Sequence, residues 1–266
     1  MPDIAGAGVR LYAERAGDGP PLLFISGTGA TLDARPRGFD LPFAASHDVV
    51  CYDQRGLGRS DRPAPGAAWS MADYADDAAR ILDWAGWDDA AVVGVSFGGM
   101  VAQELLVRHP SRVSRAALVC TSSGGSGGAS YPLHELVGLD AADYLAAFLP
   151  IMDTRWADPA YDDPLRELLA TMLASRPQPD AGNLAQLEAR RRHDTFDRLA
   201  TIAVPVLVSA GRYDGIAPLA NSEAIAAQIP GSTLKVYDGG HGFLYQVPQS
   251  VKDVADFLEG VVHTGA

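Results

Sequence analysis

The sequence of residues 91–100 is AVVGVSFGGM, an apolar, β-branched run that leads directly into a Gly-x-Ser-x-Gly motif. A helical pattern follows, and its apolar members are Met100, Val101, Leu105 and Leu106. A strand, one sharp turn carrying Ser96 and a helix are typical of a nucleophile elbow. The two glycines suit a turn that brings the backbone too close to its neighbours for a Cβ. The serine hydroxyl is therefore predicted to stand at the carboxyl end of a sheet strand.

Two backbone N–H groups are candidates for holding an oxyanion beside Ser96. The N–H of Phe97 is predicted to lie free at the N-terminus of the following helix. A second donor is expected from the loop after an early strand, Ser26-Gly27-Thr28-Gly29, and the N–H of Thr28 is our prediction. The alternative for this loop is an ordinary glycine turn with no chemical role.

The composition excludes several classes of protein. The chain has 266 residues, 47% of them hydrophobic, so it can bury a sizeable core. The formal net charge of -12 argues against nucleic acid or an anionic membrane as a partner. A cytoplasmic location is expected, because the N-terminus lacks signal-peptide features and no apolar run approaches a membrane helix in length. Cys51 and Cys120 lie in apolar runs as buried free thiols, and no Cys/His cluster has metal-ligand spacing.

Short apolar runs alternate with helical patterns on both sides of a central interruption. Strands are predicted at residues 10–16, 21–26, 47–53, 91–95, 115–121, 204–210 and 232–237. The first two are expected to form a hairpin around Gly17-Asp18-Gly19. A capping box at Ser70-Met71-Ala72-Asp73 predicts a helix start, and later helices are predicted at residues 218–227 and from Pro248. The alternation predicts a mostly parallel sheet with helices on both faces.

Residues 122–199 break this alternation. A glycine- and serine-rich run at 122–130 leads into a strand-poor stretch with helices predicted at 141–149, 164–174 and 182–192. The simplest domain organisation is one α/β core, residues 1–121 and 200–266, interrupted by a helical insertion at 122–199.

Two later loops supply the partners that a serine nucleophile needs. A serine hydroxyl reacts only with a base in contact and an acid that orients this base. The strand at 204–210 leads into a glycine turn with Asp214, and the strand at 232–237 leads into a glycine-rich loop with His241. Ser96, Asp214 and His241 thus follow the order serine, acid, histidine at strand ends, and are the predicted catalytic residues. Asp238 is a weaker candidate for the acid, because it is too near His241 along the chain to orient its ring.

The ordered motifs resemble those of the α/β-hydrolase fold family, in its small, lid-bearing, cofactor-free branch. The matching pieces are DQRGLGRS at 53–60, GVSFGG at 94–99, GRYDGIAP at 211–218 and GGH at 239–241. The resemblance implies an eight-stranded sheet, or a seven-stranded one with a reduced first strand, and makes residues 122–199 a lid. Members close to this pattern include 3-oxoadipate enol-lactonases, carboxylesterases, perhydrolases and carbon–carbon bond hydrolases. Many relatives carry His-Gly where this chain has Ser26-Gly27.

The expected function is a serine hydrolase, without cofactor or metal, that cleaves an ester or lactone of a small to medium, largely apolar substrate. A carbon–carbon hydrolase of a vinylogous diketone and a small-molecule receptor on the same fold remain alternatives, and a monomer and a homodimer are equally open. His134 and His193, in or beside the insertion, are further candidates for substrate contact. Arg155 and Arg190 to Arg192 are candidates for a substrate carboxylate, although a solvated helix face is the simpler account of the last three. The predicted substrate-binding residues are Gly27, Tyr131, Phe148, Met152 and Trp156.

Overall fold

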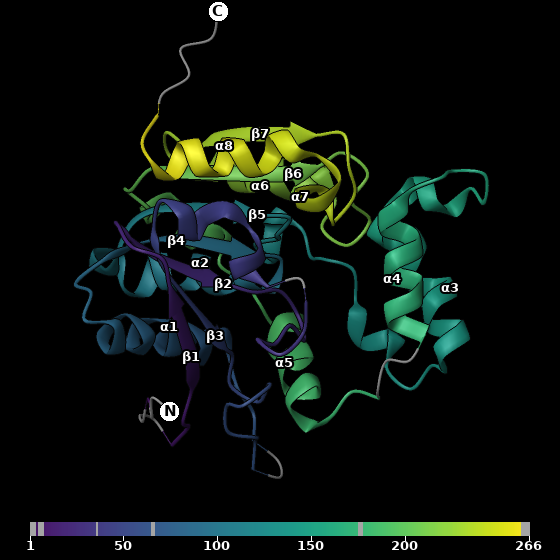
Figure 1. Ribbon diagram of the computed structural model, residues 1–266, viewed down its shortest axis with the longest axis horizontal. Coiled ribbons are helices and arrows are strands. Elements are labelled where there is room, and N and C mark those ends of the chain that lie inside the picture. The colour runs from purple at the N-terminus through teal and green to yellow at the C-terminus, as the bar shows by residue number, and fades with distance from the viewer. Residues whose placement is uncertain (1–3, 5–7, 36, 65–66, 175–177, 262–266) are drawn as a thin grey trace, which may run out of the picture.

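The computed structural model describes residues 4, 8–35, 37–64, 67–174 and 178–261, and a seven-stranded sheet forms its centre (Figure 1). The strand order is β1-β3-β2-β4-β5-β6-β7, and only β1 runs antiparallel to its neighbour. The predicted mostly parallel sheet is confirmed. Its strands are β1 (Tyr12–Ala16), β2 (Pro21–Ile25), β3 (Asp48–Asp53), β4 (Ala90–Val95), β5 (Val113–Val119), β6 (Val206–Gly211) and β7 (Thr233–Tyr237).

The predicted hairpin between the first two strands is wrong. β1 pairs with β3, with Tyr12 opposite Asp53, while β2 lies between β3 and β4 and runs parallel to both. β2 is apolar and buried on both faces, which is typical of an inner strand of a parallel sheet and not of an outer hairpin strand. Gly17, at φ 93°, directs the chain closely past the start of β3, where a Cβ would lie 2.1 Å from the His47 carbonyl oxygen.

Helices cover both faces of the sheet, as predicted. One apolar cluster joins the sheet to α1 (Met71–Ala85), α2 (Phe97–Arg108) and α6 (Leu219–Gln228). The other joins it to the short helix η2 (Pro42–Ala45), α7 (Phe243–Gln246) and α8 (Pro248–Leu258). Successive β2 residues alternate between them, since Leu23 belongs to the first cluster and Phe24 to the second. The Ser70 capping box begins α1 as the sequence predicted.

The described residues of the strand-poor stretch form three α-helices: α3 (Ala141–Met152), α4 (Pro164–Ala174) and α5 (Ala181–Arg191). Figure 1 shows α3 and α4 together at one side of the molecule, whereas α5 lies nearer the sheet. Met152 and Trp156 form a small apolar cluster there with Ile216, from the loop after β6. Ala189 of α5 and the following Leu199 belong instead to the core cluster of α1 and α2. Ala189 thus packs α5 against the core.

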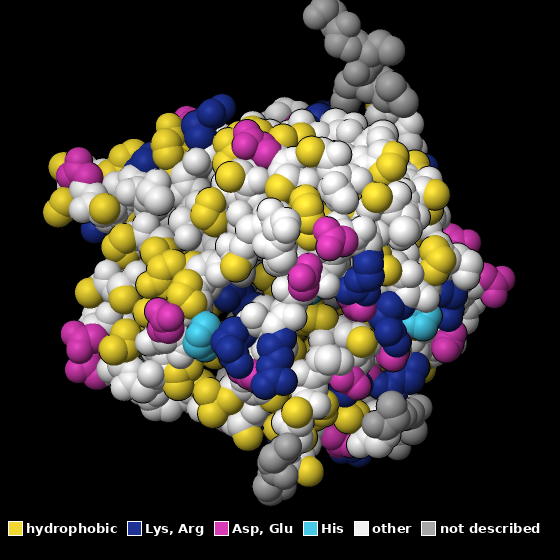
Figure 2. All heavy atoms as spheres, turned by 180° about the vertical axis from the view of Figure 1, so that it is seen from behind, with side chains coloured by type: hydrophobic (Ala, Val, Ile, Leu, Met, Phe, Trp, Pro, Cys, Tyr) yellow, Lys and Arg dark blue, Asp and Glu magenta, His cyan; other side chains and the backbone are white. Residues whose placement is uncertain are grey.

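The remaining features concern the surface and the cysteines. Within the described ranges, no helix has both the length and the apolar character needed to cross a membrane. Figure 2 shows acidic and basic side chains interspersed over one face of the molecule, so no single-signed field covers that face. Cys51 and Cys120 are buried and free, as predicted.

Candidate active site

The strand, sharp turn and helix predicted around Ser96 are present. β4 ends at Val95, α2 begins at Phe97, and Ser96 between them has φ 55° and ψ -114°. Such a backbone conformation costs energy for a residue with a Cβ, so the surroundings must hold it. The N–H of Ser96 donates to the Val119 carbonyl at 2.8 Å, and its carbonyl accepts from the Thr121 hydroxyl at 2.8 Å. The end of β5 therefore fixes the turn.

The glycines of the motif are required by close backbone approaches. A Cβ on Gly98 would lie 2.0 Å from the Ile25 carbonyl oxygen, and one on Gly94 would lie 2.4 Å from the Gly98 carbonyl oxygen. Real Cβ contacts are essentially never this short. Gly98 therefore lets α2 approach the end of β2, and Gly94 lets β4 approach the first turn of α2. This packing sets Ser96 at the carboxyl edge of the sheet.

A hydrogen-bonded chain joins Ser96, His241 and Asp214. Ser96 Oγ lies 2.9 Å from His241 Nε2, and His241 Nδ1 lies 2.7 Å from Asp214 Oδ2. Because an ionised carboxylate only accepts hydrogen bonds, Nδ1 carries the proton and Nε2 is left to accept from the serine hydroxyl. The other oxygen, Asp214 Oδ1, accepts the N–H groups of Ile216 and Ala217 at 2.8 Å each. Asp214 is thereby held rigidly, and the structure brings all three predicted residues together.

One predicted oxyanion donor, Phe97, follows Ser96 directly, and the loop of the other, Thr28, approaches the turn at Gly27. The Phe97 N–H is the first of α2 and has no partner within the helix, while its ring packs edge-on against Tyr74 at 5.0 Å. Gly27 lies against the turn, since a Cβ built on it would be 3.5 Å from Ser96 Cβ. The two residues after Gly27 differ in their hydrogen bonds. The Gly29 N–H donates to Gln186 Oε1 at 2.7 Å, whereas the Thr28 N–H has no protein acceptor among the described residues.

The other predicted substrate-binding residues occupy two different surroundings. Tyr131 and Met152 bond to the loops of Asp214 and His241: Tyr131 N–H donates to the Ile216 carbonyl at 2.7 Å, and the Met152 carbonyl accepts the His241 N–H at 2.6 Å. Phe148 stacks on Tyr144 with ring centroids 5.1 Å apart. Trp156 is only 2% exposed, and its indole N–H donates to Asp163, so its ring packs inside the α3–α4 cluster.

The C-terminal end of α3 contacts both loops that carry the partners of Ser96. Besides the bond from His241 to Met152, the Ile151 carbonyl accepts the Gly215 N–H at 2.9 Å, and Thr154 N–H donates to the Tyr213 carbonyl at 2.9 Å. Backbone groups of Ile151, Met152 and Thr154 therefore bond to both loops and hold the positions of His241 and Asp214 relative to each other.

Gln246 and Asp153 extend this contact, and sequence reasoning missed both. Gln246 Oε1 accepts the Gly240 N–H at 2.8 Å, and its amide donates to Asp153 at 3.0 Å and to Asp163 at 2.8 Å. Burial would raise the pKa of Asp153, but hydrogen bonds from Arg155 and Gln246 outweigh it and lower this pKa. The ionised Asp153 thus anchors Gln246. Neither residue lies in a motif, so the sequence held no signal for them.

Replacing Gln246 by Ala is expected to lower kcat about 10-fold, because the Gly240 N–H loses its acceptor and the His241 loop loosens. KM should change less than kcat, since the substitution acts on the position of the base. The measurement is steady-state kinetics well below the melting temperature. Gln249→Ala is the matched control: it removes an amide–carboxylate bond to Asp253 on α8, away from His241. Equal kcat values in the two variants would contradict a positioning role for Gln246.

His193, a candidate for substrate contact, is enclosed in the protein. Its Nε2 lies 3.3 Å from the Thr195 hydroxyl. Burial lowers the pKa of His193 to about 3, and the nearby cations Arg198 and Arg190 add to this effect. His193 is therefore neutral in the folded protein at pH 7. His134 is only partly buried and lies at the start of η5 (Leu133–Leu136).

The buried His193 should make folding stability fall in mild acid. The free energy of unfolding keeps its full value above pH 6.5, the pKa of histidine in the unfolded chain, and decreases as the pH falls below it. The reason is that His193 binds a proton in the unfolded chain but not in the folded one. This residue alone should cost about 2 kcal/mol between pH 7 and pH 5. Burial also lowers the pKa of His47, which adds to the total loss. The test is urea unfolding of wild type and His193→Gln at both pH values. A variant that loses as much stability as wild type would contradict the assignment.

Comparisons with known proteins agree with this fold. The family described as "alpha/beta hydrolase fold" matches residues 20–248. A 2-hydroxymuconate semialdehyde hydrolase of Pseudomonas sp. (strain CF600) is 33% identical, over 96% of this chain and 93% of its own. A 3-oxoadipate enol-lactonase of Acinetobacter baylyi is 28% identical, over 88% of this chain and 86% of its own. The crystal structure of a hydrolase from Pseudomonas aeruginosa superposes with a TM-score of 0.79 at 27% identity, covering 97% of each chain.

Proposed function

Since this chain belongs to the alpha/beta hydrolase fold family, we propose that it is a serine hydrolase that cleaves a carboxylic ester or lactone through an acyl-enzyme on Ser96. The observation that carries the proposal is the chain of hydrogen bonds from Ser96 Oγ through His241 to Asp214, at 2.9 and 2.7 Å. It supplies a nucleophile, a base with its lone pair directed at the nucleophile, and an acid that fixes the ring.

The reaction proceeds in two halves. His241 Nε2 takes the Ser96 proton as Oγ attacks the carbonyl carbon, and Asp214 stabilises the imidazolium that forms. The N–H groups of Phe97 and Thr28 hold the tetrahedral oxyanion, an interaction worth about 3 kcal/mol per donor in such sites. As the oxyanion collapses, His241 returns the proton to the leaving alcohol. Water, deprotonated by His241, then attacks the acyl group and releases the acid.

The helices α3 and α4 are proposed to act as the lid over this site, within an insertion spanning residues 122–199. Two observations support the assignment. The end of α3 bonds to the loops of Asp214 and His241, and its partly buried apolar side chains, Phe148 and Leu149 among them, lie in the cluster that reaches Ile216. An apolar roof of this kind favours a small to medium, largely apolar substrate.

A carbon–carbon bond hydrolase is the second candidate. The supporting observation is the 33% identity with the protein named 2-hydroxymuconate semialdehyde hydrolase. The same three residues would serve that chemistry, so the two candidates differ in the substrate and not in the catalytic groups.

The deciding experiment is a substrate panel combined with covalent labelling. p-Nitrophenyl esters of two, four and eight acyl carbons, an enol lactone and a vinylogous 1,5-diketone are offered to the wild-type enzyme, and a fluorophosphonate is used to label the nucleophile. Ester or lactone turnover, with the phosphonate found on Ser96 by peptide mass spectrometry, is the expected result. Cleavage of the diketone alone would favour the second candidate. Thermal stabilisation by these compounds without turnover would identify a receptor and overturn both enzyme assignments.

A further inference from the structure

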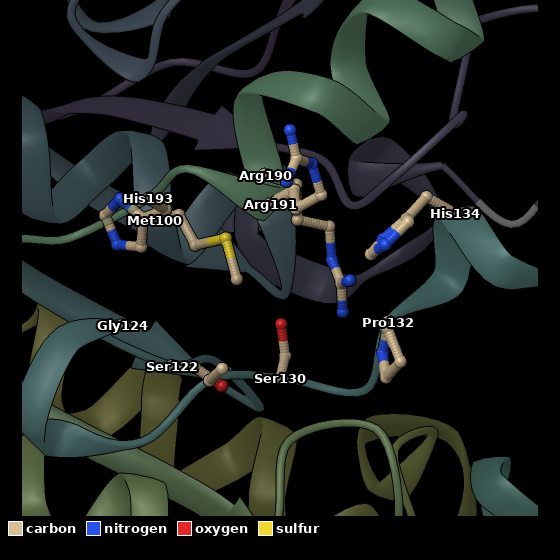
Figure 3. A pocket seen from close by; sticks show the side chains of 10 residues that line it. Met100, Ser122, Gly124, Ser130, Pro132, His134, Arg190, Arg191 and His193 are labelled. Atoms are coloured by element: carbon tan, nitrogen blue, oxygen red, sulfur yellow. The ribbon is translucent and has the colours of Figure 1, made fainter.

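A cavity of about 120 Å³ lies between the 122–134 loop and the C-terminal end of α5. Its lining includes Met100, Ser122, Ser130, His134, Arg190 and Arg191, and no Asp or Glu is among the described residues that line it. Figure 3 shows the Ser130 hydroxyl pointing into this hollow, with the arginines on the opposite side. The space is enough for a few water molecules or a small organic acid group. The cavity combines apolar surface with hydroxyl groups, and its charged members are basic.

Arg190 is the unusual residue of this wall. It is only 6% exposed, although it belongs to the arginine run that the sequence favoured as a solvated helix face. Its Nη1 donates to the Tyr131 carbonyl at 2.6 Å. Its Nε and Nη2 are buried and have no protein partner among the described residues. A buried cation with unpaired donors is costly, so a complementary anion is expected beside them.

The unpaired edge of Arg190 is the edge that other arginines of this protein use for carboxylates. Arg55 binds Asp77 through Nε and Nη2 at 2.6 and 2.7 Å, and Arg155 binds Asp153 through the same two nitrogens at 2.9 and 2.5 Å. Arg191, next to Arg190, binds Glu188 in the same way at 2.9 and 2.8 Å. This planar pair of donors matches the two oxygens of one carboxylate.

The electrostatic surroundings keep this edge available. Burial lowers the pKa of Arg190 to about 10, so the group stays cationic at pH 7, and the negative charge of Asp214 partly offsets this effect. Asp214 is itself engaged by His241, Ile216 and Ala217. Glu188 is engaged by Arg191 and by Arg192. Neither carboxylate is therefore available to pair with Arg190.

Two hydrogen-bonded connections link the wall of the cavity to the candidate active site. Met100 lies one helical turn after Ser96, and its N–H donates to the Ser96 carbonyl at 3.3 Å. Tyr131, whose carbonyl Arg190 holds, donates its own N–H to Ile216, and the N–H of Ile216 donates to Asp214.

We propose that this cavity is a carboxylate-binding site in which Nε and Nη2 of Arg190 hold both oxygens of one carboxylate. The carboxylate comes either from the far end of the ester or lactone substrate or from a free small organic acid. The first source rests on the proposed function, and the second does not.

The test combines a kinetic comparison with a stability measurement. The kinetic arm compares monomethyl adipate, which carries a free carboxylate, with methyl hexanoate, its neutral counterpart of equal chain length, in a pH-stat assay. The stability arm measures the melting temperature in acetate against chloride at equal ionic strength. Both arms use wild type, Arg190→Gln, Arg190→Lys and the control Arg192→Gln. Arg190→Lys keeps the charge but loses the paired donors, and the melting temperatures in chloride show whether each variant is folded.

A substrate carboxylate predicts that the ratio of kcat/KM for monomethyl adipate to that for methyl hexanoate falls about 10- to 100-fold in both Arg190 variants. Arg192→Gln should keep the wild-type ratio. A free organic acid predicts equal ratios in all proteins, and an acetate-dependent rise in melting temperature that both Arg190 variants lose. An unchanged ratio together with no acetate effect in wild type would overturn the site. Failure of the wild type to hydrolyse either ester would count against the proposed function. The melting temperatures in acetate would still show whether the cavity binds a carboxylate.

Discussion

Replacing Ser96 by Ala is expected to lower kcat for ester hydrolysis about 10⁶-fold, the size of loss typical of removing a triad nucleophile. His241 then has no hydroxyl to deprotonate, although the 2.9 Å contact shows that the base is already in place. The measurement is initial-rate hydrolysis of a p-nitrophenyl ester by wild type and variant. The hydroxyl adds little to folding, so the melting temperature should stay close to that of wild type.

The sharper form of this test uses a double variant. Because Ser96 and His241 act as one unit, His241→Ala alone and the double variant should each lose about as much activity as Ser96→Ala. Losses that multiply in the double variant would mean that the two residues act independently. A Ser96→Ala protein with more than about 1% of wild-type activity would contradict the acyl-enzyme mechanism.

Replacing Asp214 by Asn is expected to lower kcat about 10⁴-fold. The carboxylate accepts hydrogen bonds from three N–H groups: His241 Nδ1, Ile216 N and Ala217 N. An amide has only one accepting oxygen. Since the backbone N–H groups cannot change, the oxygen is expected to stay with them and the NH₂ to face His241. The imidazole then adopts the tautomer with Nε2 protonated, which cannot accept the Ser96 proton.

Asp238→Asn is the matched control for this variant. Asp238 is the competing acid of the sequence, it lies at the other end of the same glycine-rich loop as His241, and it is exposed. Kinetics of both variants at pH 7 should show the large loss only in Asp214→Asn. A comparable loss in Asp238→Asn would contradict the assignment of the acid.

Local sequence patterns predicted the parts of this protein that depend on short stretches of chain. The turn at Ser96 needs glycines within a few residues, and Asp214 and His241 follow strands that are themselves apolar runs. The pairing of β1 was mispredicted because β2 is the strand nearest to it in sequence. β2 instead lies between two parallel neighbours, β3 and β4, that come later in the chain.

Contacts between distant segments account for what the sequence could not show. Gln246 has a positioning role only because it forms hydrogen bonds with Gly240 and Asp153, and Asp153 is separated from it by 93 positions. Arg190 was favoured as a solvated residue because the neighbouring arginines give the helix a polar pattern. Its burial depends on the 122–134 loop, where the Tyr131 carbonyl accepts a hydrogen bond from its Nη1.

The bonds at the end of α3 bear on how this protein can be re-engineered. Exchanging the proposed lid segment for that of a relative is a direct route to new specificity, since it would leave Ser96, His241 and Asp214 in the recipient. Here, however, the donor segment must also supply the Ile151 and Met152 carbonyls, which accept from Gly215 and His241. Chimeras that keep residues 150–156 of this chain should retain turnover. Those that replace them should fold yet turn over slowly, so the insertion is not an interchangeable module.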